Sequence, residues 1–377
     1  MITKKILTII NKVIPKSNSI IFDSFPAFSD NAWALYNYII SSRPDIVEKY
    51  DLIWAQEYDV APIALPKAKY VKKKSVKGIW KFLRSRYVIS THTYSADLKS
   101  GNGQIQYNLW HGCGFKSMTE ADDCYRGDET IVTSDAYRSI HARVFKMQED
   151  HIHVTGLPRN DVLFKQSKAR QLLGINEKAK IYLWMPTYRK AALGHDEIDG
   201  NPDSFGVSSI TDEQLVVLNE LFLSSGSFLI IKPHPMDSVS VKRLQGFSNI
   251  LCYTNADLEA KGIILYELLS VSDTLLSDYS SVIIDYMLLD KPIVMVLSDK
   301  EEYQGSRGFV FEPIEEYMPG PIINDFDSLV NYFNNYEVID NEWNEKRRQL
   351  ITIFHKYRDN KSCERVCNLI WGPNVSE

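Results

Sequence analysis

Short apolar runs and amphipathic stretches alternate along nearly the whole chain. The apolar runs are bounded by polar or turn-forming residues and are short, so they predict strands that are buried on both faces. They lie at residues 19–25, 51–56, 86–93, 104–112, 179–189, 227–235, 271–276 and 291–297. Helix-period segments such as 33–42, 212–224 and 263–270 lie between them. This alternation predicts an α/β fold of parallel sheets with helices on both faces.

The last part of the chain departs from this rhythm. Residues 299–313 carry no clear period and predict a long loop. Two separate amphipathic helices are predicted at 325–333 and 342–357, and a final helix at 363–371 is expected to return to the first domain.

Polar motifs follow four of the predicted strands. They are Trp-His-Gly at 110–112, Pro-Thr-Tyr-Arg at 186–189, Lys-Pro-His-Pro at 232–235 and Ser-Asp-Tyr-Ser-Ser at 277–281. Ligands of open parallel sheets bind beyond the carboxyl ends of the strands. We therefore expect the binding residues among these motifs.

The stretch from 275 to 286 predicts a strand, a serine-rich turn and the start of a helix. Backbone N–H groups in the first turn of a helix are unpaired and attract anions, and Ser280 and Ser281 would add hydroxyl donors. The alternative is an ordinary N-cap without a ligand.

Two histidines stand in settings that suit phosphate chemistry. His111 lies between an apolar run and Gly112, where backbone crowding is low, and a neutral imidazole is a natural base for a hydroxyl. The alternative is a structural histidine that caps a turn. His234 lies between two prolines and, with Lys232, would present positive charge to a phosphoryl group. Arg159 and Arg189 are further cations at strand ends.

Length, charge and cysteines limit the class of protein. A chain of 377 residues suits two domains, and residues 1–170 carry 25 Lys and Arg against 17 Asp and Glu, whereas 171–377 carry 18 against 31. The basic half suggests an anionic contact, either a membrane surface or nucleic acid. Five cysteines without framework spacing indicate reduced cytosolic thiols. No apolar run is long enough to cross a bilayer, and we expect no signal peptide and no zinc site.

Two basic amphipathic segments suit an anionic membrane surface. Residues 2–16 predict a short helix with isoleucines and lysines, which either lies in a bilayer interface or packs on the protein's own core. Residues 67–86 combine nine Lys and Arg with apolar side chains. A solvated helix face is the alternative for such a charge run. We expect membrane or lipid-phosphate contact by Lys72, Lys73, Lys74, Lys77 and Trp80.

Several common active sites are absent from the sequence. No Gly-rich dinucleotide fingerprint or Walker-type loop follows a strand, and no G-x-S-x-G elbow is present. No His and carboxylate cluster suggests a metal site.

The motifs together resemble one family. WHGCGFKSM, GLPRNDVLF, LWMPTYR, KPHP, LLSDYSSVIIDYMLLDKPIVMV, EEYQGSRGFVFE and YMPGP occur in the order found in the CDP-glycerol glycerophosphotransferases. These bacterial enzymes prime and polymerise teichoic acids and some phosphopolyol capsules. The start, FDSFPAFSDNAWALYNYI, is also similar, so the resemblance covers nearly the whole chain.

The resemblance implies a GT-B-like architecture of two Rossmann-like domains with an active-site cleft between them. Residues 1–170 would face the acceptor and the membrane, and residues 171–377 would bind the CDP donor. An acceptor hydroxyl would attack the β-phosphate of CDP-glycerol and release CMP, with no metal or other cofactor.

The resemblance also assigns roles to residues. His111 would be the base and His234 would stabilise the phosphates. The donor site would be lined by Gly112, Arg159, Pro186, Thr187, Arg189, Lys232, Ser280, Ser281 and Asp285. The acceptor would be lipid-linked through undecaprenyl diphosphate, or polymeric, at the cytoplasmic face of the membrane, with the enzyme bound peripherally and no nucleic acid involved.

Two departures from the family pattern leave room for alternatives. Cys113-Gly114 stands where the family usually has Thr-Pro, which predicts a looser loop beside the base, and Lys232 stands where arginine is common. A ribitol donor is one alternative. A GT-B glycosyltransferase or nucleotide-sugar epimerase is another, and a non-catalytic polymer- or nucleic-acid-binding module is the third.

Overall fold

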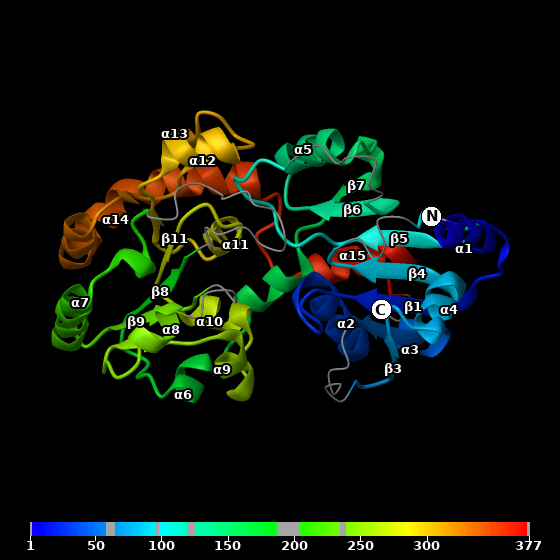
Figure 1. The fold of residues 1–377 in the computed structure, drawn as a ribbon, viewed down its shortest axis with the longest axis horizontal. Coiled ribbons are helices and arrows are strands. Elements are labelled where there is room, and N and C mark those ends of the chain that lie inside the picture. Colours follow the sequence, from blue (N-terminus) through cyan, green and yellow to red (C-terminus); the bar gives the residue numbers. More distant parts are fainter. Residues whose placement is uncertain are drawn as a thin grey trace. The chain divides into compact units, whose positions relative to one another are not determined.

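The computed structural model describes residues 2–57, 65–92, 94, 98–118, 126–186, 204–233 and 239–374. The chain folds into two compact units (Figure 1). Unit 1 comprises Met1–Cys113, Met118–Asp161 and Phe354–Glu377, and unit 2 comprises Gly114–Ser117 and Val162–Ile353. Each unit contains one sheet whose paired strands are all parallel, so the predicted α/β class with two parallel sheets is confirmed.

Unit 1 is built on a seven-stranded sheet with the order β3-β2-β1-β4-β5-β6-β7. Its strands are β1 (Ser17–Asp23), β2 (Asp51–Gln56), β3 (Ala68–Lys72), β4 (Ser85–Ser90), β5 (Ile105–Asn108), β6 (Glu129–Val132) and β7 (Ile152–Val154). The direction of progression reverses at β1, where β2 and β4 flank the first strand. The carboxyl ends of β1, β4 and β5 are therefore neighbours.

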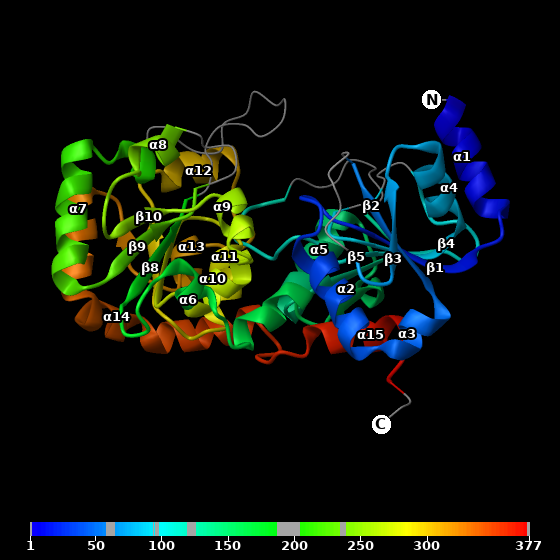
Figure 2. The ribbon, with the colours of Figure 1, turned by 90° about the horizontal axis from the view of Figure 1, so that it is seen from below.

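Helices cover both faces of this sheet because its central strands are apolar on both sides. Ile20 and Phe22 of β1 pack with α2 (Asp30–Ser42), α3 (Pro44–Lys49) and α15 (Ser362–Trp371). Ile21 points to the opposite face and packs with α4 (Val76–Arg84) and α1 (Ile2–Val13). Figure 2 shows these two groups of helices on opposite sides of the strands.

The remaining helical segments of unit 1 are α5 (Asp135–Phe145) and the 3-10 turns η1 (Glu149–His151) and η2 (Pro158–Phe164). The chain returns to this unit at Phe354, and Asp161 fixes the last helix. Its carboxylate accepts hydrogen bonds from the backbone N–H groups of Ser362 and Cys363, each at 2.8 Å. These are first-turn donors that a helix leaves unpaired, so Asp161 caps α15 from a distant point in the sequence.

Unit 2 contains a six-stranded sheet with the order β10-β9-β8-β11-β12-β13. Its strands are β8 (Ile181–Met185), β9 (Phe228–Ile231), β10 (Ile250–Cys252), β11 (Thr274–Ser277), β12 (Ile293–Val296) and β13 (Ile322–Ile323). Tyr182 and Trp184 pack on one face against α7 (Asp212–Ser225) and α14 (Phe326–Phe354). The alternate residues Leu183, Ile230 and Leu275 are also fully buried, so both faces are covered.

Helix α7 of unit 2 begins and ends at residues that commonly cap helices. Thr211 and Gln214 form a capping box at the start of α7, and Gly226 ends it in the left-handed conformation. The helical segments are α6 (Ala169–Leu173), η3 (Val207–Ser209), α7 (Asp212–Ser225), α8 (Val239–Arg243), α9 (Asn255–Ala260), α10 (Leu265–Val271), α11 (Val282–Met287), α12 (Lys300–Ser306), α13 (Ile314–Tyr317) and α14 (Phe326–Phe354).

One expectation about the last part of the chain is wrong and another holds. The predicted loop at 299–313 contains α12, because Glu301 and Glu302 stabilise its first turn and fully buried Tyr303 anchors it. The two helices predicted at 325–333 and 342–357 are both present within α14. They meet at a kink where Asn335 has non-helical backbone angles, and the second helix begins earlier than predicted and ends at Phe354. Among the described residues, no helix is long and apolar enough to cross a membrane.

Candidate functional site

The turn that carries His111 follows β5 and is held against the end of β4. The Leu109 N–H donates to the Ser90 carbonyl at 2.7 Å, and the Trp110 N–H donates to Asn108 Oδ1 at 3.0 Å. Trp110 adopts a left-handed backbone with φ of +54°, and Gly112 has φ of +132°. A tryptophan in this conformation is strained by about 1–2 kcal/mol, so the surroundings must hold the turn in place.

Asn31, fully buried in the first turn of α2, holds this turn. Its Nδ2 donates to the carbonyls of Leu109 at 3.2 Å and Trp110 at 2.8 Å. Its Oδ1 accepts a hydrogen bond from the Arg159 N–H at 3.1 Å. One amide thus joins α2, the His111 turn and η2, and it satisfies three backbone groups that would otherwise be buried without partners.

Arg159 supports the same turn from η2. Its Nη1 lies 2.9 Å from Asp30 Oδ1 and donates to the His111 carbonyl at 2.9 Å, and the residue is 8% exposed. These contacts make Arg159 a positioning residue for the His111 turn. Its expected place in a donor site stays a prediction.

The His111 ring is packed among other rings. It is parallel to His92, with ring centroids 4.3 Å apart and 4° between the planes, and it lies 4.1 Å from the Trp110 ring. Burial, with His92 and Arg159 nearby, lowers the pKa of His111 to about 3, against a hydrogen bond to the Thr91 backbone that raises it. His111 is nevertheless exposed to solvent on part of its surface, and the downward direction of the shift means that its imidazole is neutral at pH 7.

A second polar group lies at the ends of β1 and β3. Lys73 Nζ is 2.6 Å from Asp23 Oδ2 and 4.6 Å from the centre of the Tyr94 ring. Burial raises the pKa of Asp23 to about 6, and Lys73 opposes that shift. Lys73, which the charge pattern grouped with the membrane-facing lysines, is therefore bound inward, whereas Lys72, Lys74 and Lys77 are exposed.

In unit 2, the 275–286 stretch forms the predicted strand, turn and helix. β11 is fully buried, Ser277 Oγ donates to the Met185 carbonyl at 2.7 Å, and Ser281 is the N-cap of α11. Gly114 lies against this turn, because a Cβ placed on it would be 3.1 Å from the Ser281 Cβ. Cys113 is 2% exposed, and the looser loop expected from Cys113-Gly114 stays a prediction.

Asp285 and Lys232 are both buried in unit 2. Asp285 is 1% exposed and accepts a hydrogen bond from the Tyr266 hydroxyl at 2.6 Å. Lys232 follows β9, is 6% exposed, and burial lowers its pKa to about 8. An ammonium group at this depth favours an anionic partner, since a bound anion would stabilise its charged form and raise its pKa again.

The other predicted binding residues are only partly covered by the structure. Pro186 is half-buried directly after β8. Thr187, Arg189 and His234 lie outside the described residues, so their roles stay predictions. The expected active-site cleft also stays a prediction.

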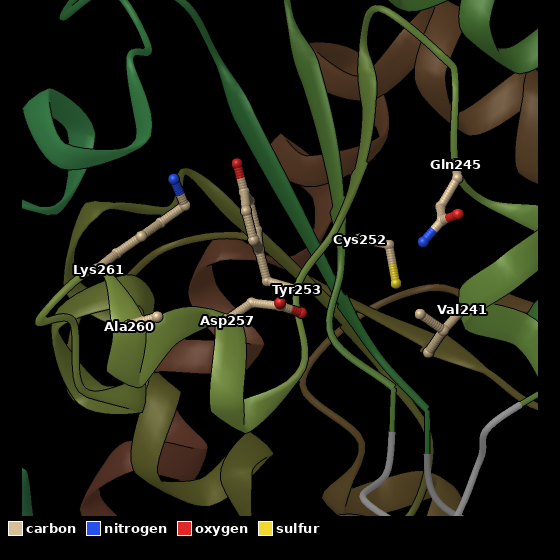
Figure 3. Close-up of a pocket in the computed structure, with 7 residues that line it drawn as sticks. All are labelled: Val241, Gln245, Cys252, Tyr253, Asp257, Ala260 and Lys261. Atoms are coloured by element: carbon tan, nitrogen blue, oxygen red, sulfur yellow. The ribbon is translucent and has the colours of Figure 1, made fainter.

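A pocket of about 420 Å³ lies in unit 2 between α8, β10 and α9 (Figure 3). Its described lining residues are Val241, Gln245, Cys252, Tyr253, Asp257, Ala260 and Lys261. None of them is among the residues predicted from the motifs. In the part of the chain that the structure describes, no group of three or more His, Cys, Asp or Glu side chains is placed to hold a metal ion.

The basic segments of unit 1 form a mixed surface on α1 and α4, which contact each other. Leu7, Ile10 and Ile14 pack into the core, as does Ile79. On the outside, five large apolar side chains are exposed: Ile6 by 50%, Ile9 by 63%, Val13 by 76%, Val76 by 86% and Trp80 by 53%. We call these five residues the α1–α4 apolar surface. The helix at 2–16 therefore both packs on the core and presents apolar side chains outward.

Sequence reasoning missed His92, Asn31 and Asp30. His92 follows a predicted strand but has no partner nearby in sequence, and Asp30 and Asn31 fell in the predicted loop before the helix at 33–42. The available signal for His92 was its position directly after a strand, whereas Asp30 and Asn31 lie in the first turn of α2 and offered no such signal. Only the strand order brings β1, β4 and β5 together.

The fold defines the class to which the chain belongs. The model superposes on the wall teichoic acid polymerase TagF with a TM-score of 0.79 at 22% identity, covering 97% of this chain and 92% of that one. It also matches a UDP-N-acetylglucosamine 2-epimerase from Listeria monocytogenes with a TM-score of 0.53 at 12% identity, covering 94% of this chain and 96% of that chain. The predicted GT-B-like fold is confirmed.

The chain belongs to the CDP-glycerol:poly(glycerophosphate) glycerophosphotransferase family, whose model matches residues 6–372. It is 25% identical to the teichoic acid ribitol-phosphate polymerase TarL of Staphylococcus aureus (strain NCTC 8325 / PS 47), over 95% of this chain and 63% of TarL. It is 25% identical to the teichoic acid glycerol-phosphate transferase of the same strain, over 95% of this chain and 94% of that protein. The family predicted from the motifs is confirmed, and the chain spans less than two thirds of the length of TarL.

Proposed function

We propose that this protein transfers a polyol phosphate, glycerol phosphate in the first instance, from a CDP-activated donor to an acceptor hydroxyl and releases CMP. The observation that carries the proposal is the family match over residues 6–372, which includes the His111 turn and the strand ends of both units. The relatives are named as teichoic acid polymerases and transferases, and one TagF structure was soaked with CDPG.

In this proposal His111 is the general base. In this proposal the Thr91 backbone, which acts to raise the pKa of His111, holds one ring nitrogen and leaves the other nitrogen to accept a proton. The acceptor oxygen bonds to the β-phosphorus, the bond from that phosphorus to the CMP oxygen breaks, and His111 takes the hydroxyl proton. The anionic diphosphate of a bound donor would raise the pKa of His111 from its low value toward the working pH.

Positive and dipolar groups would hold the donor phosphates. Lys232 is buried at a strand end, and Ser280 and Ser281 begin α11. His234 and Arg189 complete the predicted set, with Gly112, Pro186, Thr187 and Asp285 as further donor contacts. Such groups stabilise charge that develops on transferred phosphate without a metal.

A donor panel tests this function. The purified protein is incubated with an acceptor and with CDP-glycerol, CDP-ribitol or UDP-sugars in turn, and released CMP and UDP are measured. We expect CMP from a CDP-polyol, and a His111→Asn variant serves as the inactive control. Release of UDP alone would instead support the glycosyltransferase or epimerase alternative.

Ribitol is the second candidate polyol. The favouring observation is that TarL and TarK of Staphylococcus aureus (strain NCTC 8325 / PS 47), which match 95% and 94% of this chain, are both named ribitol-phosphate polymerases. In the same panel, CMP release from CDP-ribitol that exceeds release from CDP-glycerol would establish this alternative.

The acceptor in this proposal is polymeric or linked to undecaprenyl diphosphate, and the protein works peripherally at the cytoplasmic face of the membrane. The α1–α4 apolar surface supports membrane contact, because apolar side chains beside exposed Lys12, Lys72 and Lys77 suit an anionic interface. Each lysine near such a surface contributes about 1 kcal/mol.

Vesicle flotation tests the membrane contact. A variant with Ile9→Ser and Trp80→Ser should bind anionic phosphatidylglycerol vesicles at least about tenfold more weakly, because it loses two large apolar contacts. Val338→Ser is the matched control, since Val338 is 67% exposed on α14 in unit 2. Equal flotation of the double variant and the control would rule this surface out.

A further inference from the structure

His92 lies outside the predicted motifs and contacts His111 directly. It follows β4, and its ring is stacked on the His111 ring at 4.3 Å with a 4° interplanar angle. Two parallel rings at this distance are in van der Waals contact, so the His111 ring cannot rotate about its Cβ–Cγ bond without displacing His92.

The position of His92 is itself fixed. Its Nδ1 is hydrogen-bonded to Thr91 Oγ1 at 3.3 Å, and Phe25 meets the ring edge-to-face at 6.2 Å. The Thr91 N–H donates to the Asp23 carbonyl at 3.2 Å, which ties the segment to the end of β1. The His92 ring is therefore held in place by contacts to residues that follow β1 and β4, the two neighbouring strands in the middle of the sheet.

The same short segment contacts His111 twice. The Thr91 backbone hydrogen-bonds to the His111 ring, while the His92 ring covers one of its faces. Trp110 lies against His111 with its plane tilted by 38°. The ring orientation is set by neighbours that directly follow β4 and by Trp110 in the turn, as a base needs if one nitrogen is to meet a substrate hydroxyl.

We propose that His92 is a positioning residue for His111, which holds the imidazole of the base in a stacked orientation and in its neutral form. The inference rests on the proposed function, because it gives His111 the role of base. His92 itself need not touch the substrate.

The electrostatic surroundings agree with this role. Two imidazolium rings 4.3 Å apart would repel strongly, so at most one of the two rings is in the charged imidazolium form near neutral pH. Burial lowers the pKa of His92 as well as that of His111. The other charged or titratable groups acting on the pair are Asp30 on α2, Lys73 after β3, Arg159 on η2 and His141 on α5.

Two substitutions separate stacking from simple packing. His92→Ala removes the ring, and His92→Phe keeps a flat ring of similar size without nitrogens. His151→Ala is the matched control, because His151 is an exposed histidine beside Glu129 in the same unit. All are made in the full chain, and CMP release from the active CDP-polyol is measured across about pH 5 to 9.

We expect His92→Ala to lower kcat by about tenfold to a hundredfold, with KM for the donor changed less than about threefold, since a misplaced base affects the chemical step. His92→Phe should retain kcat within about threefold. The His151→Ala control should match the unsubstituted protein in both constants.

A spectroscopic measurement separates this inference from the proposed function. The protein is labelled with ¹³C at histidine Cε1, and the His111 signal is assigned with His111→Asn. We expect the chemical shift of this signal to report a neutral His111 ring down to about pH 5 in the unsubstituted protein and in His92→Phe. In His92→Ala it should titrate above about pH 5, because the uncovered ring is better hydrated.

An unchanged His111 titration in His92→Ala would overturn the inference, whatever happens to activity. A loss of kcat in His92→Phe equal to that in His92→Ala would also overturn it, because stacking would then not be the cause. If no CDP-polyol yields CMP, the proposed function fails, and the titration still decides whether His92 controls the state of His111.

Discussion

Asn31 offers the sharpest test of how the His111 turn is held. Asn31→Ala removes the amide that serves the carbonyls of Leu109 and Trp110 and the N–H of Arg159. Each buried backbone group left without a partner costs about 1–3 kcal/mol. Some of that cost is recovered where water enters the space of the lost amide. We therefore expect the free energy of unfolding to fall by about 3 kcal/mol.

For a domain of this size, that loss lowers Tm by roughly 6–12 °C, which calorimetry or circular dichroism measures directly. The strained Trp110 backbone would also relax once its carbonyl loses its donor. We expect kcat for CMP release to fall by about tenfold to a hundredfold, because His111 moves with the turn.

Two further variants decide which contact matters. Asn31→Asp keeps the acceptor for Arg159 but loses both donated hydrogen bonds and places a carboxylate beside two carbonyl oxygens. It should be at least as destabilising as Asn31→Ala. Asn37→Ala, at an exposed position of the same helix, is the matched control and should leave Tm unchanged or slightly higher. An Asn31→Ala protein with the Tm and kcat of the control would refute the reasoning.

Three other predictions follow from the structure. His111→Ala should lower kcat by about two orders of magnitude or more while CDP-donor affinity, measured by calorimetry, survives; near-normal turnover would remove His111 as the base. His141 is fully buried, neither ring nitrogen has a hydrogen-bond partner among the described residues, and burial lowers its pKa to about 3. Below about pH 6.5 the unfolded chain binds a proton at His141 that the folded chain does not bind. The contribution of neutral His141 to the free energy of unfolding is therefore complete above about pH 6.5 and falls by about 1.4 kcal/mol per pH unit toward pH 3. His141→Phe should therefore raise the free energy of unfolding by about 1–2 kcal/mol at pH 7 and flatten its decline in acid, and an unchanged acid slope in urea titrations would contradict this. Asp161→Asn should cost about 2 kcal/mol through the start of α15, whereas Asp150→Asn, at an exposed carboxylate, should cost nothing measurable; equal stabilities would mean that the long-range cap is unimportant.

The strand and helix rhythm could be predicted from the sequence because it depends on local periodicity. The buried runs at 51–56 and 291–297 and the helix at 212–224 correspond closely to β2, β12 and α7. The motif positions could be predicted for the same reason, since an apolar run followed directly by polar turn residues is a pattern of neighbouring residues in the sequence. Local patterns failed at α12, where a single buried tyrosine and helix-dipole effects outweigh a sequence with little periodicity.

The support of the His111 turn could not be predicted, because its parts are far apart in the chain. Asn31 reaches residues about eighty positions later, and Arg159 reaches Asp30 across 129 positions. Lys73 looked like one more lysine in a basic run, yet it is bound to Asp23, fifty positions earlier. Partners of this kind depend on strand order, which hydrophobic periodicity does not encode.

The sequence by itself determined that this protein is an α/β chain with parallel strands, which residues end those strands, and which family it belongs to. Apolar periodicity and motif order are properties of neighbouring residues, so one dimension is enough to read them. Only the tertiary structure decided that His92 stacks on His111, that Asn31 clamps the turn and that Lys73 points inward. The first two contacts exist because β1, β4 and β5 lie side by side in the sheet, and the third exists because only β2 separates β3 from β1. The free energy that selects this strand order is summed over the whole core.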